Sequence, residues 1–190
     1  MFSKILSRVR RNHGLEHATI HMLAKKHGNF SAQGNSNHRG FALNIFSDKI
    51  TEDDIAAAVN EAFTRMKGGE HALAIHPNCG TVLLTTATMT TLAAQAAFSV
   101  EHARQQASRT DGSVFINGLP GAILASVIAL ITSKPVGLHL QEKYTTEGDL
   151  GAMELVSIKP VKPNVVTRIF QMLLTDGKKK PTSYFITTTG

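Results

Sequence analysis

The residues between positions 10 and 28 have the types and spacing of a metal site. His13, His17 and His21 recur every four residues, so on a helix their side chains form one slowly turning stripe. Two histidines four apart on a helical face can share a zinc ion through their imidazole nitrogens. Glu16 lies at the edge of the same face, where a carboxylate can take a proton from metal-bound water. The pattern predicts a divalent-metal site, with zinc as the cofactor and Glu16 as the catalytic base if the site is open.

A second pair of ligand-type residues lies further along the chain, where His76 and Cys79 form an H-x-x-C. Imidazole and thiolate both bind zinc, and this spacing lets one loop offer two ligands. We expect His13, His17 and His76 to bind the metal, with His21 or Cys79 completing the set. Four protein ligands would make a closed structural site, whereas three ligands and a water would leave a catalytic one. The alternative is a hydrogen-bonded histidine network without a metal.

The elements that must position these residues follow from apolar periodicity and from helix start and stop signals. Helical spacing of apolar residues predicts an N-terminal helix over 2–27 that ends at Gly28. Thr51, followed by three acidic residues, predicts the start of a second helix, which ends at Gly68 and Gly69. Strands are predicted at 40–47, at 71–76 and in the segments AMELVSIKPV and SYFITTT, with one short strand in the turn-rich stretch before residue 40.

Two long uncharged runs interrupt this pattern, at about 81–100 and 113–133. Each is close to the roughly 20 residues that a helix needs to cross a bilayer. Residues 1–80 carry ten Lys and Arg and residues 134–190 carry eight, whereas the loop between the runs carries two. Basic residues accumulate on the cytoplasmic side of membrane proteins, so both termini are predicted to be cytoplasmic.

The predicted architecture is therefore an α/β (α+β) cytoplasmic domain interrupted by a membrane hairpin. Residues 1–80 and 135–190 form the discontinuous domain, and residues 81–134 form a two-helix transmembrane hairpin. The late strands are expected to join the sheet begun by the earlier ones. The predicted location is a membrane, with the hairpin in the bilayer and the rest of the chain in the cytoplasm.

The charge and composition narrow the choice of partners. The net charge is +6, and a basic protein binds either nucleic acid or an anionic membrane surface. Trp is absent, and no segment combines clustered Arg and Lys with aromatic residues, which argues against nucleic acid as a partner. The lipid bilayer is the predicted partner, alongside an unidentified protein partner or substrate. One cysteine excludes an intrachain disulfide and favours a reducing compartment.

Three motifs carry a resemblance to a known family: Asn12–His21, Leu73–Thr81, and Leu140-Gln141 with Thr145–Asp149. Together they resemble an uncharacterised bacterial family of small membrane proteins whose domain has no known function. The similarity covers about residues 10–160. It implies two membrane helices between the second and third motifs, a location in the inner membrane of a bacterium, and no established activity.

A more local resemblance concerns His13–His17, which reads H-x-x-E-H as in inverted zinc metallopeptidases. Those enzymes use a further acidic ligand downstream, for which Glu61 and Glu70 are the candidates by position. The leading hypothesis is a membrane-anchored protein with a zinc site at the cytoplasmic membrane face and a peptidase-like hydrolase activity. The competing hypothesis is a non-catalytic membrane or assembly protein with a structural metal site or no metal.

Overall fold

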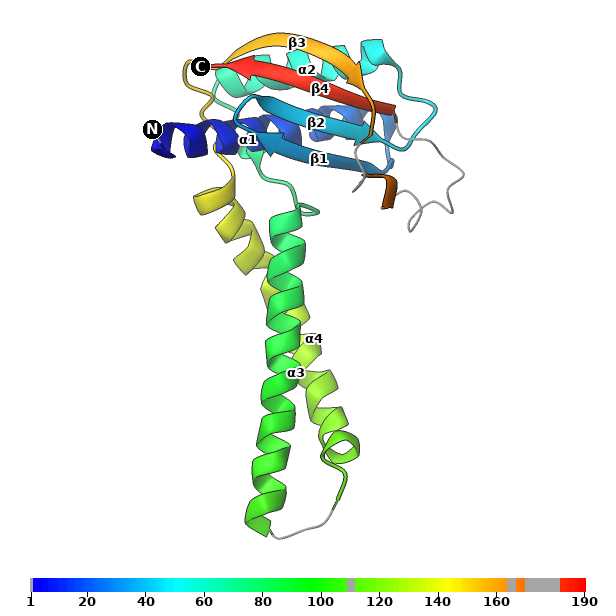
Figure 1. The fold of residues 1–190 in the computed structure, drawn as a ribbon, viewed down its shortest axis with the longest axis vertical. Helices are drawn as coiled ribbons and strands as arrows, with labels where there is room; N and C mark the ends of the chain where they lie inside the picture. Colours follow the sequence, from blue (N-terminus) through cyan, green and yellow to red (C-terminus); the bar gives the residue numbers. More distant parts are fainter. Residues whose placement is uncertain (1, 109–111, 164–166, 170–181) are drawn as a thin grey trace. The chain divides into compact units, whose positions relative to one another are not determined.

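The computed structural model describes residues 2–108, 112–163, 167–169 and 182–190 and divides the chain into two compact units (Figure 1). The first unit comprises Met1–His76 and Glu142–Gly190, and the second comprises Pro77–Gln141. The second unit is thus inserted in the chain of the first.

The long helix α1 (Phe2–His27) forms because its apolar residues recur at helical spacing. Leu15, Ala18 and Met22 are buried on one face and join the hydrophobic core. Gly28 ends the helix with a φ of 71°, and its N–H donates to the Ala24 carbonyl at 2.9 Å. A left-handed glycine at this position is a common helix stop, so the predicted helix and its end are confirmed.

Four antiparallel strands form one sheet in the order β1-β2-β4-β3 (Figure 1). Their bounds are β1 Ala32–Asn37, β2 Gly40–Ile45, β3 Glu154–Val161 and β4 Thr182–Thr189. The late strands therefore join the early ones, as expected from the sequence. Phe41 and Leu43 of β2 lie opposite Ile186 and Tyr184 of β4, and all four side chains are buried in the core.

A second helix, α2 (Glu52–Lys67), packs beside α1 and closes the core of the first unit. Thr51 accepts a hydrogen bond from the Asp54 N–H and the Asp54 carboxylate accepts one from the Thr51 N–H, which together form a capping box. Ile55, Val59 and Ala62 are fully buried on one face of the helix. The predicted N-cap and the stop at Gly68 are both confirmed.

The predicted strand over residues 71–76 is wrong: His71–Ala74 form the short 3-10 helix η1. A short, mostly apolar run closed by Pro77 suggested a strand, but in the structure η1 packs against α1. The carbonyl oxygens of Ala74 and Ile75 instead face histidine rings of α1. The sheet of the described residues is consequently fully antiparallel, and the fold is α+β.

The second unit is a pair of long helices, α3 (Gly80–Ser108) and α4 (Val114–Leu140), that lie side by side (Figure 1). Small residues of α4 allow the close contact. A Cβ on Gly137 would lie 2.9 Å from the Cα of Val82, and one on Gly118 would lie 2.8 Å from the Phe98 ring. The buried residues of α4 are all small: Gly118, Ala122, Ala129, Ser133 and Gly137. Such small-residue packing is typical of helices in membranes.

Several hydroxyl groups of this pair form hydrogen bonds within or between the two helices. Thr85 and Thr90 donate their hydroxyls to carbonyl oxygens four residues earlier, each at 2.8 Å. Thr86 and Ser133 form a hydrogen bond between the two helices, also at 2.8 Å. Threonine can therefore sit in an apolar environment without an unpaired hydroxyl, which explains how α3 carries so many of them.

Both helices are long and apolar enough to cross a bilayer. Only 6% of the most apolar window of α3 is buried, and only 17% of that of the helical span Val114–Thr145, which begins with α4. Large apolar residues such as Leu84, Ile116 and Ile131 are about 70% exposed. The core helix of a soluble protein would bury these side chains instead.

Candidate metal centre

Four histidines of the first unit lie together, three from α1 and one just after η1. The ring centroids of His13 and His17 are 4.4 Å apart. His76 lies between two turns of the α1 stripe, with its ring 5.7 Å from that of His17 and 4.9 Å from that of His21. The predicted stripe and the residue that follows η1 are thus brought together, because η1 crosses α1 and carries the chain past the stripe.

Backbone carbonyl groups orient three of these rings. Nδ1 of His17 lies 2.7 Å from the Ala74 oxygen, and Nδ1 of His13 lies 2.9 Å from the Thr145 oxygen. A carbonyl oxygen only accepts, so Nδ1 carries the proton and Nε2 of each neutral ring keeps its lone pair. Metal-binding histidines usually donate their second ring N–H in this way. The carbonyl contacts therefore prepare both Nε2 atoms to bind a cation.

His21 and His76 differ from this arrangement. In His21 it is Nε2 that lies 2.8 Å from a carbonyl, that of Ile75, which leaves Nδ1 with the lone pair. Burial, and then the neighbouring His21 and His17, lower the pKa of His76 to about 4. His76 is thus a neutral imidazole at physiological pH, the form that can bind a metal. Its role as a ligand, like that of His21, stays a prediction.

Cys79 is the N-terminal capping residue of α3, because Leu83 N–H donates to its carbonyl at 3.1 Å. The N–H of Thr81 points at its sulfur at 3.4 Å, and the side chain is buried. Cysteine binds a metal ion through its thiolate sulfur. The ligand atoms of His13, His17 and Cys79 lie within 4.8 Å of one another, a group that could hold a metal ion.

Glu16 is buried but lies against the sheet. Its carboxylate accepts a hydrogen bond of 2.6 Å from Ser36 of β1. It occupies the space that a side chain at Gly34 would fill, since a Cβ there would clash with the Glu16 carboxylate. Neither Ser36 nor Gly34 was suggested by the sequence, because their link to Glu16 depends on how β1 packs against α1. The role of Glu16 as a general base stays a prediction.

Position 14, inside the H-x-x-E-H motif, is a glycine, although glycine is a poor helix former. The structure shows why a side chain is excluded there. A Cβ at this position would lie 2.4 Å from the Glu147 oxygen and 3.1 Å from the Ala74 Cβ. The absence of a side chain lets residues 145–147 lie against α1, where the Glu147 N–H donates to the Arg10 oxygen at 3.0 Å. Gly14 therefore brings the Thr145 carbonyl to His13.

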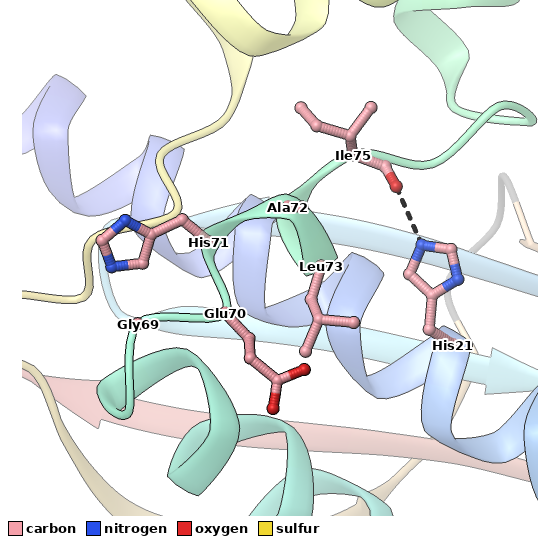
Figure 2. A pocket seen from close by; sticks show the side chains of 7 residues that line it. All are labelled: His21, Gly69, Glu70, His71, Ala72, Leu73 and Ile75. Carbon is pink, nitrogen blue, oxygen red and sulfur yellow. Dashed lines mark hydrogen bonds between the residues drawn. The ribbon is translucent and has the colours of Figure 1, made fainter.

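A pocket of about 430 Å³ opens beside the histidines and is lined by residues of α1 and of the η1 segment (Figure 2). Figure 2 shows the His21 ring and the Leu73 side chain on one side and Glu70 below them. Arg65 holds the Glu70 carboxylate through two hydrogen bonds and also contacts Glu61. Neither glutamate belongs to the group of close ligand atoms, so the expected acidic ligand has no support among the described residues.

The family model of a domain of unknown function, DUF6391, matches residues 8–158, a range that includes all three motifs. An uncharacterised protein of Picosynechococcus sp. (strain ATCC 27264 / PCC 7002 / PR-6) is 36% identical over 91 residues. That alignment covers 43% of each chain, so the similarity spans less than half of the relative. No solved structure matches the chain. The chain belongs to the DUF6391 family, a family of unknown function.

Proposed function

We propose that the protein is a membrane-anchored metal-binding protein whose centre holds one divalent cation, zinc, through His13, His17 and Cys79. The observation that carries this proposal is the convergence of two imidazoles and a thiol within 4.8 Å. Two nitrogen donors and one sulfur donor are a set that zinc prefers over magnesium or calcium.

The contacts around the histidines support the same conclusion. His13 and His17 direct their Nδ1–H groups at backbone carbonyls, as metal-binding histidines usually do with the ring nitrogen that does not bind the metal. His76 is the neighbouring imidazole that could complete four ligands and close the site.

The second candidate function is a zinc-dependent hydrolase, because the group of close ligand atoms comes from three residues only. Three protein ligands leave the fourth position of zinc open to water, as in catalytic sites. The pocket beside His21 offers room for a peptide side chain. Glu16 would be the general base, and this requires its carboxylate to leave Ser36 at least transiently.

The membrane part of the proposal rests on α3 and α4. Their large apolar side chains are exposed while their small ones are buried, which fits a lipid surrounding. The surplus of Lys and Arg on both sides of the pair supports an inner-membrane location with both termini in the cytoplasm. The untagged protein should therefore need detergent to leave the membrane fraction, and partition into the soluble fraction would refute this part.

The metal proposal is tested on protein purified in detergent without an affinity tag. We expect one zinc per chain by elemental analysis, and loss of that zinc in His17→Ala. His38→Ala is the matched control, because His38 is exposed on the β1–β2 turn, away from the cluster. Equal zinc content in the two variants would overturn the assignment.

The hydrolase candidate is tested with Glu16→Gln and a library of quenched fluorescent peptides. A hydrolase should retain zinc in this variant but lose peptide cleavage. A structural centre should show no zinc-dependent cleavage in the wild type. Glu61→Gln is the control, because Glu61 is exposed on α2.

A further inference from the structure

We propose that the outer face of α3, made of Thr88, Thr91 and Gln95, pairs within the bilayer with the same face of a second copy of this chain. This inference rests on the membrane part of the proposed function and is independent of the metal. It uses the geometry of the second unit alone.

The three side chains of the outer face lie together, on the side of α3 away from α4. Their spacing of three and then four residues keeps them within about 60° of the helix circumference. Gln95 follows Thr86 by about two and a half turns, so it lies on the opposite side from the Thr86 hydroxyl that bonds to Ser133 of α4. All three side chains are exposed. The outer face is therefore open to a helix of another chain.

The outer face also differs from the rest of α3 in its hydrogen bonding. Thr85 and Thr90 donate to carbonyl oxygens of their own helix, and Thr86 bonds to α4. Within the described part of the chain, the side chains of the outer face form no hydrogen bond. Gln95 is the hardest of them to satisfy, because its amide carries two N–H donors and an acceptor oxygen, and a helix interior offers that oxygen no free N–H.

Gln95 lies at a depth where lipid cannot supply these partners. The uncharged run covers residues 81–100, and Gln95 is about five residues, or roughly 7 Å, from its middle. The hydrocarbon core extends about 15 Å to either side of the bilayer centre, so the amide is inside it. A polar side chain at that depth usually forms a hydrogen bond with a neighbouring helix.

A second copy of the chain supplies the matching group at the matching depth. Two chains inserted in the same direction carry Gln95 at equal depth, so a two-fold axis along the bilayer normal brings the two amides together. Each amide can then donate an N–H to the oxygen of the other. Ala87 and Thr91 are small, exposed and four residues apart, which is the spacing that lets two membrane helices approach closely.

The first test measures dimerisation of the full chain by sedimentation equilibrium in density-matched detergent. We expect a dimer for the wild type, and a dissociation constant about tenfold higher in Gln95→Leu, for the loss of two hydrogen bonds between the helices. Gln106→Leu is the control, because Gln106 is exposed on the same helix beyond the uncharged run and bonds to His102. A monomeric wild type, or equal dissociation constants in the two variants, would overturn the inference.

The second test locates the contact in native membranes by oxidative cross-linking. Thr91→Cys should form disulfide-linked dimers, whereas the wild type, with Cys79 alone, should not. Ile128→Cys is the matched control, since Thr91 follows Thr86 and Ile128 precedes Ser133 by the same number of residues, and the Ile128 side chain is 55% exposed on α4. Equal cross-linking of the two cysteine variants would contradict the inference. A chain found in the soluble fraction would instead refute the membrane proposal, so the two failures are distinguishable.

Discussion

Replacing Gly14 with alanine tests how the metal centre is built without altering any ligand. Helix propensity alone predicts that Gly14→Ala stabilises the protein by up to about 1 kcal/mol. The structure predicts the opposite, because the new Cβ would lie 2.4 Å from the Glu147 oxygen. Relieving this clash requires residues 145–147 to move away from α1 by about 1 Å, since ordinary contacts begin near 3.4 Å.

That movement weakens three hydrogen bonds between α1 and the segment: Glu147 N–H to Arg10, Arg10 to Thr146, and His13 to Thr145. Each contributes about 1 kcal/mol net, so their loss outweighs the gain in propensity and leaves a destabilisation of about 2 kcal/mol. Loss of the carbonyl that orients His13 should also weaken metal affinity by about 10-fold or more, as is usual for groups that position a ligand.

The assay is competition for zinc against a chromophoric chelator, together with thermal unfolding in the same detergent. Gly121→Ala is the matched control, because Gly121 is also helical but a Cβ there has nothing within 4 Å. Wild-type zinc affinity and unchanged or increased stability in Gly14→Ala would refute this account of how His13 is positioned.

Two further predictions concern the metal-free protein and the hairpin. Because burial lowers the pKa of His76 to about 4, the unfolded chain binds a proton below about pH 6.5 that the folded chain does not. Stability should therefore fall as pH drops from 6.5 towards 4, and a His76→Asn variant whose stability falls equally over that range would contradict the assignment. Thr86→Val removes the hydrogen bond to Ser133, so it should destabilise α3–α4 association by about 0.6 kcal/mol in detergent. Thr132→Val, whose hydroxyl bonds within α4, is the control, and equal effects of the two changes on unfolding would argue against this contact.

Local signals in the sequence predicted most of the helices and strands. The capping residues around Thr51 and the left-handed Gly28 mark helix ends through contacts within a few residues, so they can be read from the chain alone. The two apolar helices follow from length and composition. The strand prediction at 71–76 was wrong because a short apolar run fits a strand as well as a helical turn, and the 3-10 helix His71–Ala74 forms where this segment packs against α1.

The sequence indicated residues that the structure brings together, but not how their side chains are arranged. The spacing of His13 and His17 places both on one face of any helix, and H-x-x-C offers a second pair of donors. The carbonyls of Ala74 and Thr145, which orient the rings, have no sequence signal because every residue carries a carbonyl. The contact of Glu16 with Ser36 likewise joins residues 20 positions apart through the packing of β1 on α1.

The central claim is that His13, His17 and Cys79 bind the same divalent cation, and cobalt substitution tests it most directly. We predict that the apo-protein binds one Co²⁺ per chain and shows a thiolate-to-cobalt charge-transfer band. The band should disappear in Cys79→Ser, should be lost or weakened in His17→Ala, and should persist in His38→Ala. Absence of stoichiometric cobalt in the wild type, or an unchanged band in Cys79→Ser, would contradict the account.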